Sequence, residues 1–121
     1  MSDGRESPSA PAESGELRRL RHKIDRLDRR IVDLLNERAE LARAVGHEKL
    51  RIGRRAVRDR EREREVLLRV SMANDGPMPQ ADLLGVFRRL IASARTLEAR
   101  ERDRAARTIS VVEPPEDEPG A

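Results

Sequence analysis

The 121-residue chain contains no cysteine, no tryptophan and no tyrosine, and it has a single phenylalanine. Without cysteine it can form neither disulfide bonds nor thiolate metal sites, a composition that suits a reducing cytosol. No apolar run approaches the length of a membrane-spanning helix, and the first 14 residues contain no hydrophobic stretch typical of a secretion signal. We therefore expect a soluble, cytoplasmic protein that does not bind membranes.

Charged residues make up 40% of the chain and hydrophobic residues 36%, so a chain of this length forms one domain with a modest core. Alternation of apolar and polar residues with a period of two is absent, which argues against strands. The helix-favouring residues arginine, glutamate, leucine and alanine dominate instead. These features predict an all-α fold without a sheet.

The net charge of +3 does not by itself indicate nucleic-acid binding. Most arginines alternate with glutamate and aspartate, as in the segment DREREREVLLR, which is typical of a solvated helix face with ion pairs. With one phenylalanine, the chain also lacks a set of aromatic residues that could stack on bases. We expect no nucleic-acid partner.

Composition divides the chain into a helical domain with a tail on either side. Residues 1–14 are rich in serine, proline, alanine and glycine, and residues 108–121 end in an acidic, proline-containing segment. Both compositions are typical of disordered tails. Residues 15–107 carry the helical pattern, and we expect them to form the folded domain.

Three helices are expected within this domain. The first begins after Ser14, a favourable N-cap, and runs to about Leu50. The second begins after Asp59, another N-cap, and ends at the turn that starts with Asn74. The third begins near Pro79, because proline is well accommodated in the first turn of a helix.

The first helix, at 1.5 Å per residue, is about 50 Å long and exceeds the width of so small a domain. The two shorter helices cannot cover its whole apolar face. A second copy of the chain can cover the remainder, and two-fold symmetry is the commonest closed arrangement. We expect a homodimer in which the long first helices pack against each other.

Two cations interrupt the apolar face of the first helix. Arg38 and Lys49 lie three or four residues from their apolar neighbours, where a leucine is expected. A buried cation is costly unless an anion meets it, so the pattern favours a site for a negatively charged ligand or partner. The alternative is that both long side chains reach water past the apolar surface. The complete stripe is Leu20, Ile24, Leu27, Ile31, Leu34, Leu35, Arg38, Leu41, Ala42, Val45 and Lys49.

Charged residues also occupy inward positions of the other helices. Glu63 and Glu98 follow the helical spacing of their apolar neighbours in the second and third helices. Arg62 borders the same face of the second helix, and Arg21 lies on the flank of the first stripe. All three helices are therefore expected to present charges of both signs to one interior.

Taken together, these segments resemble the all-helical class of chorismate mutases. The resemblance covers residues 16–100 and rests on the order of the patterns L-R-x-x-I-D-x-x-D, E-R-x-x-L-A-x-x-V-G-x-x-K and the R-E pair after the loop. It implies a three-helix subunit with a very long first helix, in an intertwined homodimer whose sites are shared between the chains. It also implies an isomerase that rearranges chorismate to prephenate in phenylalanine and tyrosine synthesis, with no metal or organic cofactor.

The resemblance assigns roles to the charged residues. Arg38 and, from the partner subunit, Arg21 are implied to bind the two carboxylates of chorismate, which suits the forked geometry of guanidinium groups. Lys49 is implied to contact the ether oxygen, where it stabilises the negative charge that grows as the C–O bond breaks. Glu63 is implied to accept a hydrogen bond from the ring hydroxyl. The residues implied to bind substrate are Arg21, Arg38, Lys49, Asp59, Arg62, Glu63, Ala94 and Glu98, with catalysis assigned to Arg38, Lys49 and Glu98.

Two positions depart from the commonest pattern of this class, which has serine and glutamine where this chain has Ala94 and Glu98. Ala94 cannot make the hydroxyl contact. The adjacent Ser93 does not replace it, because one residue turns about 100° around a helix. If Glu98 pairs permanently with Lys49, the site is weak or suited to another substrate.

The basic loop and one glycine leave alternatives open. The loop residues Arg51, Arg54, Arg55 and Arg58 either steer a dicarboxylate toward the site or are simply solvated. Gly46, inside the first helix, either makes room for a ligand or partner backbone or marks a weak last turn.

Alternatives to the implied function also stay open. The same scaffold can act on another chorismate derivative, as a mutase of 4-amino-4-deoxychorismate or as a lyase that releases pyruvate from isochorismate. The chain can instead be a non-catalytic helical dimer that serves as a regulatory or interaction module. A free-standing mutase can also depend on another biosynthetic enzyme as an activating partner.

We predict that turnover of chorismate falls as the pH rises and Glu98 loses its proton, and that Glu98→Gln removes this dependence. A glutamine amide donates a hydrogen bond at any pH, whereas a glutamate donates only when it is protonated. Profiles of kcat against pH for the two proteins measure the effect. Identical profiles contradict a role of Glu98 in the reaction.

Overall fold

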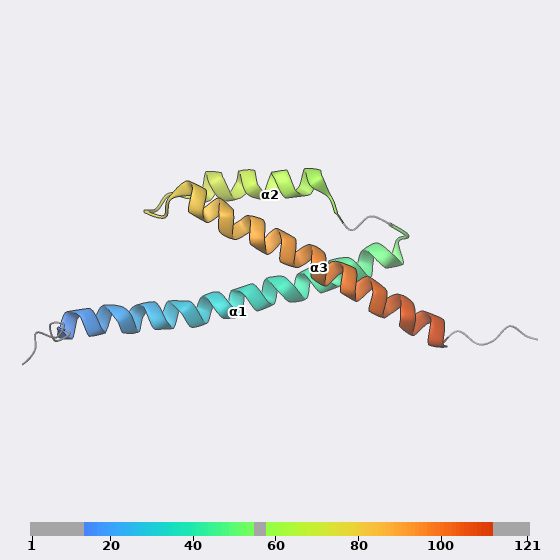
Figure 1. Cartoon of the computed structure of the whole chain (residues 1–121), viewed down its shortest axis with the longest axis horizontal. Helices are drawn as coiled ribbons and strands as arrows, with labels where there is room; N and C mark the ends of the chain where they lie inside the picture. The colour runs from blue at the N-terminus through green and yellow to red at the C-terminus, as the bar shows by residue number, and fades with distance from the viewer. Residues whose placement is uncertain (1–13, 55–57, 113–121) are drawn as a thin grey trace, which may run out of the picture. The chain divides into compact units, whose positions relative to one another are not determined.

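The structure, a computed structural model, describes residues 14–54 and 58–112. These residues form three α-helices and no strand: α1 (Gly15–Arg51), α2 (Arg60–Ala73) and α3 (Gln80–Val112) (Figure 1). The predicted all-α fold with a long first helix is confirmed. Within the described part of the chain, no helix is both long and apolar enough to cross a membrane.

The chain separates into two units, Met1–Asn36 and Glu37–Ala121. Helix α1 passes through the boundary, so its first part belongs to the first unit. Its last part belongs to the second unit, together with α2 and α3. Every contact between helices that is described below lies within the second unit.

Polar side chains fix the starts of α1 and α2. The Ser14 hydroxyl accepts a hydrogen bond from the backbone N–H of Leu17 at 3.0 Å. The Asp59 carboxylate accepts one from the backbone N–H of Arg62, also at 3.0 Å. Both predicted N-caps are therefore confirmed.

A glycine in the left-handed conformation ends α1. Gly53 has a φ of 78° and donates its backbone N–H to the carbonyl of Leu50 at 3.0 Å. The backbone N–H of Arg54 donates to the carbonyl of Lys49 at 2.8 Å. These two bonds form a Schellman motif, which satisfies the last helical carbonyls and turns the chain back.

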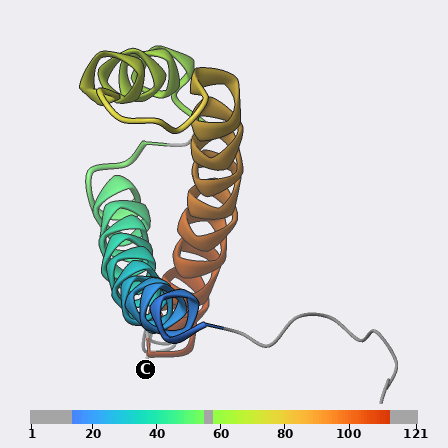
Figure 2. The same cartoon turned by 90° about the vertical axis from the view of Figure 1, so that its left-hand side faces the viewer.

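Helices α2 and α3 lie side by side and run antiparallel (Figure 1, Figure 2). Asn74 organises the turn between them, because its amide donates to the Met78 carbonyl at 3.1 Å and to the Gln80 side-chain oxygen at 2.8 Å. The Gln80 amide in turn donates to the carbonyl of Ser71 at 3.3 Å. This polar network ties the last turn of α2 to the first turn of α3.

Helix α3 is longer than the sequence predicted. The expected tail 108–121 begins inside the helix, because residues 108–112 continue α3. The preceding segment EARERDRAAR, expected as a polar extension of the third helix, consists mostly of strong helix formers. The Thr108 hydroxyl also donates to the carbonyl of Arg104 at 3.0 Å. The helix therefore continues past the expected domain end at residue 107.

Other expectations fall outside the described residues. They concern residues 1–13 and 113–121 of the two tails, and Arg55 of the basic loop.

Helices α1 and α3 approach each other very closely at Gly46. A Cβ atom at this position would lie 2.6 Å from the backbone oxygen of Glu98 and 2.7 Å from its Cα. Next to this contact, the Arg43 guanidinium pairs with the Glu101 carboxylate at 3.4 Å. Gly46 thus makes room for the backbone of another helix in the same chain.

One copy of the chain buries few side chains. Ala42 and Ile91 are the buried hydrophobic residues among those described, and Lys49 is the buried charged residue. Large hydrophobic side chains remain exposed instead. They include Leu17, Leu20, Ile24, Leu27, Ile31, Leu34, Leu41, Leu68, Met72 and Val86. The apolar stripe predicted on the first helix is therefore largely uncovered in a single chain.

We predict that Gly46→Ala destabilises the fold by about 1–3 kcal/mol, the usual cost of overpacking. It does so although alanine is favoured over glycine in a helix by about 1 kcal/mol. Gly85→Ala in α3 is the control, because an added Cβ there meets no atom within 4 Å. Urea unfolding followed by circular dichroism compares the variants, and an unchanged stability of Gly46→Ala contradicts the close helix contact.

Candidate functional site

A pocket of about 420 Å³ lies between the three helices of the second unit, a volume typical of small-molecule sites. It brings together all the predicted site residues except Arg21: Arg38, Lys49, Asp59, Arg62, Glu63, Ala94 and Glu98. Two further arginines, Arg54 and Arg95, complete its charged lining. Leu41, Ala42, Val45, Val66 and Ile91 form its apolar lining.

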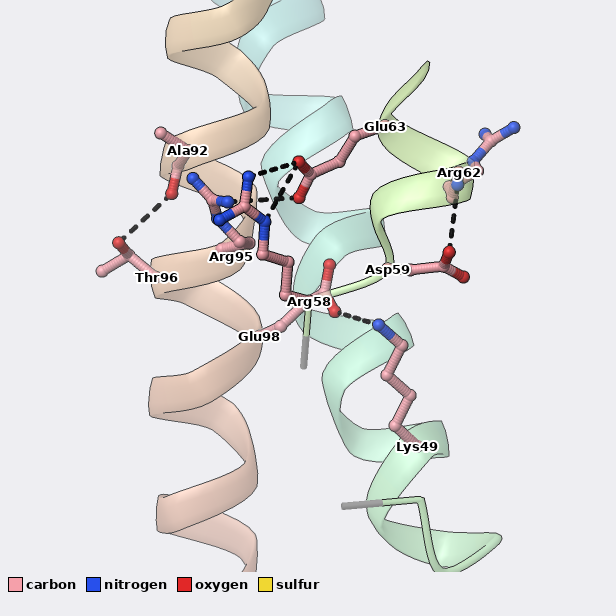
Figure 3. Close-up of polar contacts among 9 residues, drawn as sticks. All are labelled: Lys49, Arg58, Asp59, Arg62, Glu63, Ala92, Arg95, Thr96 and Glu98. Carbon is pink, nitrogen blue, oxygen red and sulfur yellow. Dashed lines mark hydrogen bonds and ion pairs between the residues drawn. The ribbon is translucent and has the colours of Figure 1, made fainter. Parts of the chain in front are cut away.

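Lys49 and Glu98 form a nearly buried ion pair across the pocket. The Lys49 Nζ lies 2.7 Å from the Glu98 Oε1, and the two side chains are only 11% and 13% exposed. The side chains point toward each other from α1 and α3 (Figure 3). Lys49 therefore does not reach water past the apolar surface, and the prediction that it faces inward is confirmed. Removing either partner breaks a buried ion pair, at about 3–5 kcal/mol.

Arg38 lies three turns before Lys49 on the same face of α1. It is half-buried and lines the pocket, as its place in the apolar stripe predicted. Arg21 belongs to the first unit, and its expected position beside a ligand depends on a second copy of the chain.

Glu63 lies between two arginines. Its Oε1 accepts hydrogen bonds from Arg58 at 3.3 Å, and its Oε2 accepts one from Arg95 at 3.2 Å. The Glu63 side chain is only 17% exposed, and the two guanidinium groups converge on it from the start of α2 and from α3 (Figure 3). Each carboxylate oxygen thus has its own cation, which fixes the orientation of the group.

Asp59 combines a structural role with a place in the pocket wall. The hydrogen bond from the backbone N–H of Arg62 lowers the pKa of Asp59 below its ordinary value of 3.8, and the nearby Arg54 and Lys49 add to this effect. The Arg54 guanidinium lies 3.8 Å from the carboxylate. Asp59 therefore caps α2 in its ionised form at neutral pH.

The side chain of Arg62 has a different orientation. Its guanidinium pairs with Glu65 at 2.9 Å and points away from Lys49 and Glu98 (Figure 3). Arg62 lines the pocket but directs its charge along the exposed face of α2.

Ala94 lines the pocket where the commonest pattern of the resembling class has serine. The adjacent Ser93 is exposed and lines a shallow groove elsewhere on α3, together with Arg89 and Thr96. The expectation that Ser93 cannot replace the missing hydroxyl is confirmed, since the two residues face different directions.

Arg95 was not predicted as a site residue from the sequence, and the role of Arg54 stayed open. Arg95 follows the buried Ile91 by four residues, the same spacing that led to Glu98, so the helical periodicity could have revealed it. Arg54 follows the helix end, and its direction depends on the positive φ of Gly53, which periodicity does not describe.

The pocket lining contains many charged groups but few kinds of functional group. It offers guanidinium, ammonium and carboxylate groups, and no serine, cysteine or histidine is among the described residues that form it. Among residues 14–54 and 58–112, no group of three or more metal-ligating side chains could hold a metal ion. The arrangement suits the binding of an anionic ligand and the electrostatic stabilisation of developing charge.

Comparison with known proteins gives a consistent result. Residues 20–99 match the model of the family described as chorismate mutase type II. The chain is 38% identical over 87 residues to a bifunctional chorismate mutase/prephenate dehydratase of Aquifex aeolicus, covering 69% of this chain and 24% of that protein. It is 40% identical over 78 residues to the protein of the same name from Neisseria gonorrhoeae, covering 64% of this chain and 21% of the relative.

A third relative with the same name, from Stutzerimonas stutzeri, is 37% identical over 91 residues, which cover 72% of this chain and 25% of the relative. The chain thus spans about a quarter of the length of the relatives that it matches. No solved structure matches the chain.

Proposed function

This chain belongs to the chorismate mutase type II family, and we propose that it catalyses the rearrangement of chorismate to prephenate, which makes it an isomerase of phenylalanine and tyrosine biosynthesis. The observation that carries the proposal is the pocket. Cations and carboxylates that are up to 60 positions apart in sequence line one cavity of suitable size.

The cations of the pocket bind the two carboxylates of chorismate. Arg38 binds one of them, and Arg21 of the partner subunit binds the other. Guanidinium groups suit this task because they stay charged when partly buried and form two parallel hydrogen bonds with a carboxylate. Binding both carboxylates holds the substrate in the folded conformation in which its two reacting ends face each other, which removes entropy from the barrier.

Lys49 acts on the bond that breaks. Its ammonium group stabilises negative charge on the ether oxygen as the C–O bond lengthens, with no covalent intermediate. Its counter-ion in this structure is Glu98, at 2.7 Å. When chorismate enters, its carboxylate competes with Glu98 for Lys49. Glu98 assists the reaction only when it is protonated, because only then can it donate a hydrogen bond to the ether oxygen.

Glu63 and Asp59 form the wall for the ring of the substrate. Glu63 accepts a hydrogen bond from the ring hydroxyl, and its orientation by Arg58 and Arg95 supports this role. Asp59 and Arg62 complete the wall, with Asp59 also holding the start of α2.

The active molecule is a homodimer, and the exposed stripe of α1 supports this proposal. Ile24 and Leu27, for example, are 55% and 50% exposed, while only two hydrophobic residues are buried among those described. So small a core does not stabilise a chain of this length. A second copy that covers the stripe adds apolar burial and brings Arg21 of the partner subunit to the site. The lack of cysteine supports a cytoplasmic location.

We predict that the purified chain converts chorismate to prephenate and that Arg38→Met lowers kcat/KM by about a hundredfold, because a buried charge pair with the substrate is lost. Arg51→Met is the matched control, since Arg51 is on the same helix and pairs with Glu48 at the surface. The loss of chorismate is followed by ultraviolet absorbance, and prephenate is identified as phenylpyruvate after acid treatment. A folded wild-type protein without turnover between pH 5 and 8 contradicts the proposal.

We predict that two inactive variants, Arg21→Met and Arg38→Met, regain activity when they are unfolded and refolded together. A mixed dimer then contains one site with both arginines and one site with neither. Random pairing restores about a quarter of the wild-type sites. Refolding each variant alone is the control. Failure of the mixture to regain activity, with mixed dimers detected by mass spectrometry, contradicts a site shared between subunits.

A further inference from the structure

We infer that Arg95, together with Arg58, selects substrates that present an uncharged hydrogen-bond donor to Glu63. A ring hydroxyl is accepted, and an ammonium group at the same position is rejected. The inference rests on the proposed function, since it takes Glu63 as the residue that faces this substituent. It decides between chorismate and its 4-amino analogue, an alternative that the sequence left open.

The charges around Glu63 carry the argument. One carboxylate faces two guanidinium groups, at 3.2 Å from Arg95 and 3.3 Å from Arg58, so the cluster has a positive excess. The neighbouring charges do not reverse this excess, because the carboxylates of Glu98 and Asp59 have cations of their own. Glu98 pairs with Lys49, and Asp59 lies near Arg54.

Arg95 contributes most to the selection because of its location. It lines the pocket from α3 and is 31% exposed, whereas the Arg58 side chain is 51% exposed. Charges that are partly withdrawn from water interact more strongly than those at the surface. The residue before Arg95 is Ala94, which has no polar group of its own. The polar groups that α3 contributes to the pocket are therefore Arg95 and Glu98, and Glu98 is paired with Lys49.

A hydroxyl and an ammonium group meet this cluster differently. Each oxygen of Glu63 can accept more than one hydrogen bond, so a neutral hydroxyl binds without losing either arginine. An ammonium group also donates hydrogen bonds, but it brings a third positive charge to one carboxylate. Like charges brought together in a partly buried site disfavour that ligand strongly. Binding of the amine is then opposed by the charges of Arg95 and Arg58.

The test compares chorismate with 4-amino-4-deoxychorismate in the wild-type protein and in Arg95→Met. We expect the wild type to prefer chorismate and Arg95→Met to reduce this preference about tenfold, as removal of one unit charge at short range implies. Arg95→Lys keeps the charge and is expected to retain the preference. Arg107→Met, which removes an exposed arginine further along α3, is the control for the helix.

Preference is measured as the ratio of kcat/KM values, and as the ratio of Kd values from calorimetry if the protein binds both compounds without turnover. Arg58→Met provides a second variant with the same expected direction, and circular dichroism verifies that each variant is folded. An unchanged ratio in both Arg95→Met and Arg58→Met overturns the inference. If chorismate is still converted to prephenate, the proposed function stands. Binding without turnover rejects the proposed activity alone. If neither compound binds, both the proposed function and the inference are overturned.

Discussion

The close contact between α1 and α3 is the constraint on which the rest of the site depends. Because residue 46 has no side chain, the backbone of α3 at Glu98 lies against α1. One turn later, Lys49 meets the Glu98 carboxylate at 2.7 Å. A larger spacing between the helices would pull these two charges apart in a nearly dry environment, which is far more costly than keeping the pair. The glycine and the ion pair therefore require each other, and together they set the width of the pocket.

This arrangement uses interior space for charge instead of apolar packing. A helical subunit of this size is normally stabilised by leucine and isoleucine buried between its helices. Here the space between the helices holds Lys49, Glu63 and Glu98, while the large aliphatic side chains of α1 face outward. The pocket is therefore formed within one chain, whereas the stability of the fold is the proposed contribution of the homodimer interface.

Much of this site follows from helical periodicity, and the exceptions have physical causes. Arg38, Lys49, Glu63 and Glu98 were predicted because a residue three or four positions from apolar neighbours shares their face. Asp59 was predicted from the chemistry of helix capping. Arg54 was not assigned, because its direction depends on one backbone dihedral angle at Gly53. Residues 108–112 were assigned to a tail from their composition, whereas α3 continues through them. The role of Arg21 depends on a second copy, which no pattern within one chain specifies.

The pairing of charges inside the pocket has a consequence for how its cations are held. Sites that bind dianions often collect cations whose mutual repulsion is relieved only by the ligand, so that function is maintained at the expense of stability. In this chain Lys49 already has Glu98, and Arg95 already has Glu63. A ligand that binds either cation must therefore compete with a carboxylate of the protein itself. The carboxylates of Glu98 and Glu63 thus hold two cations of the pocket in place, so the fold itself sets the geometry of these groups.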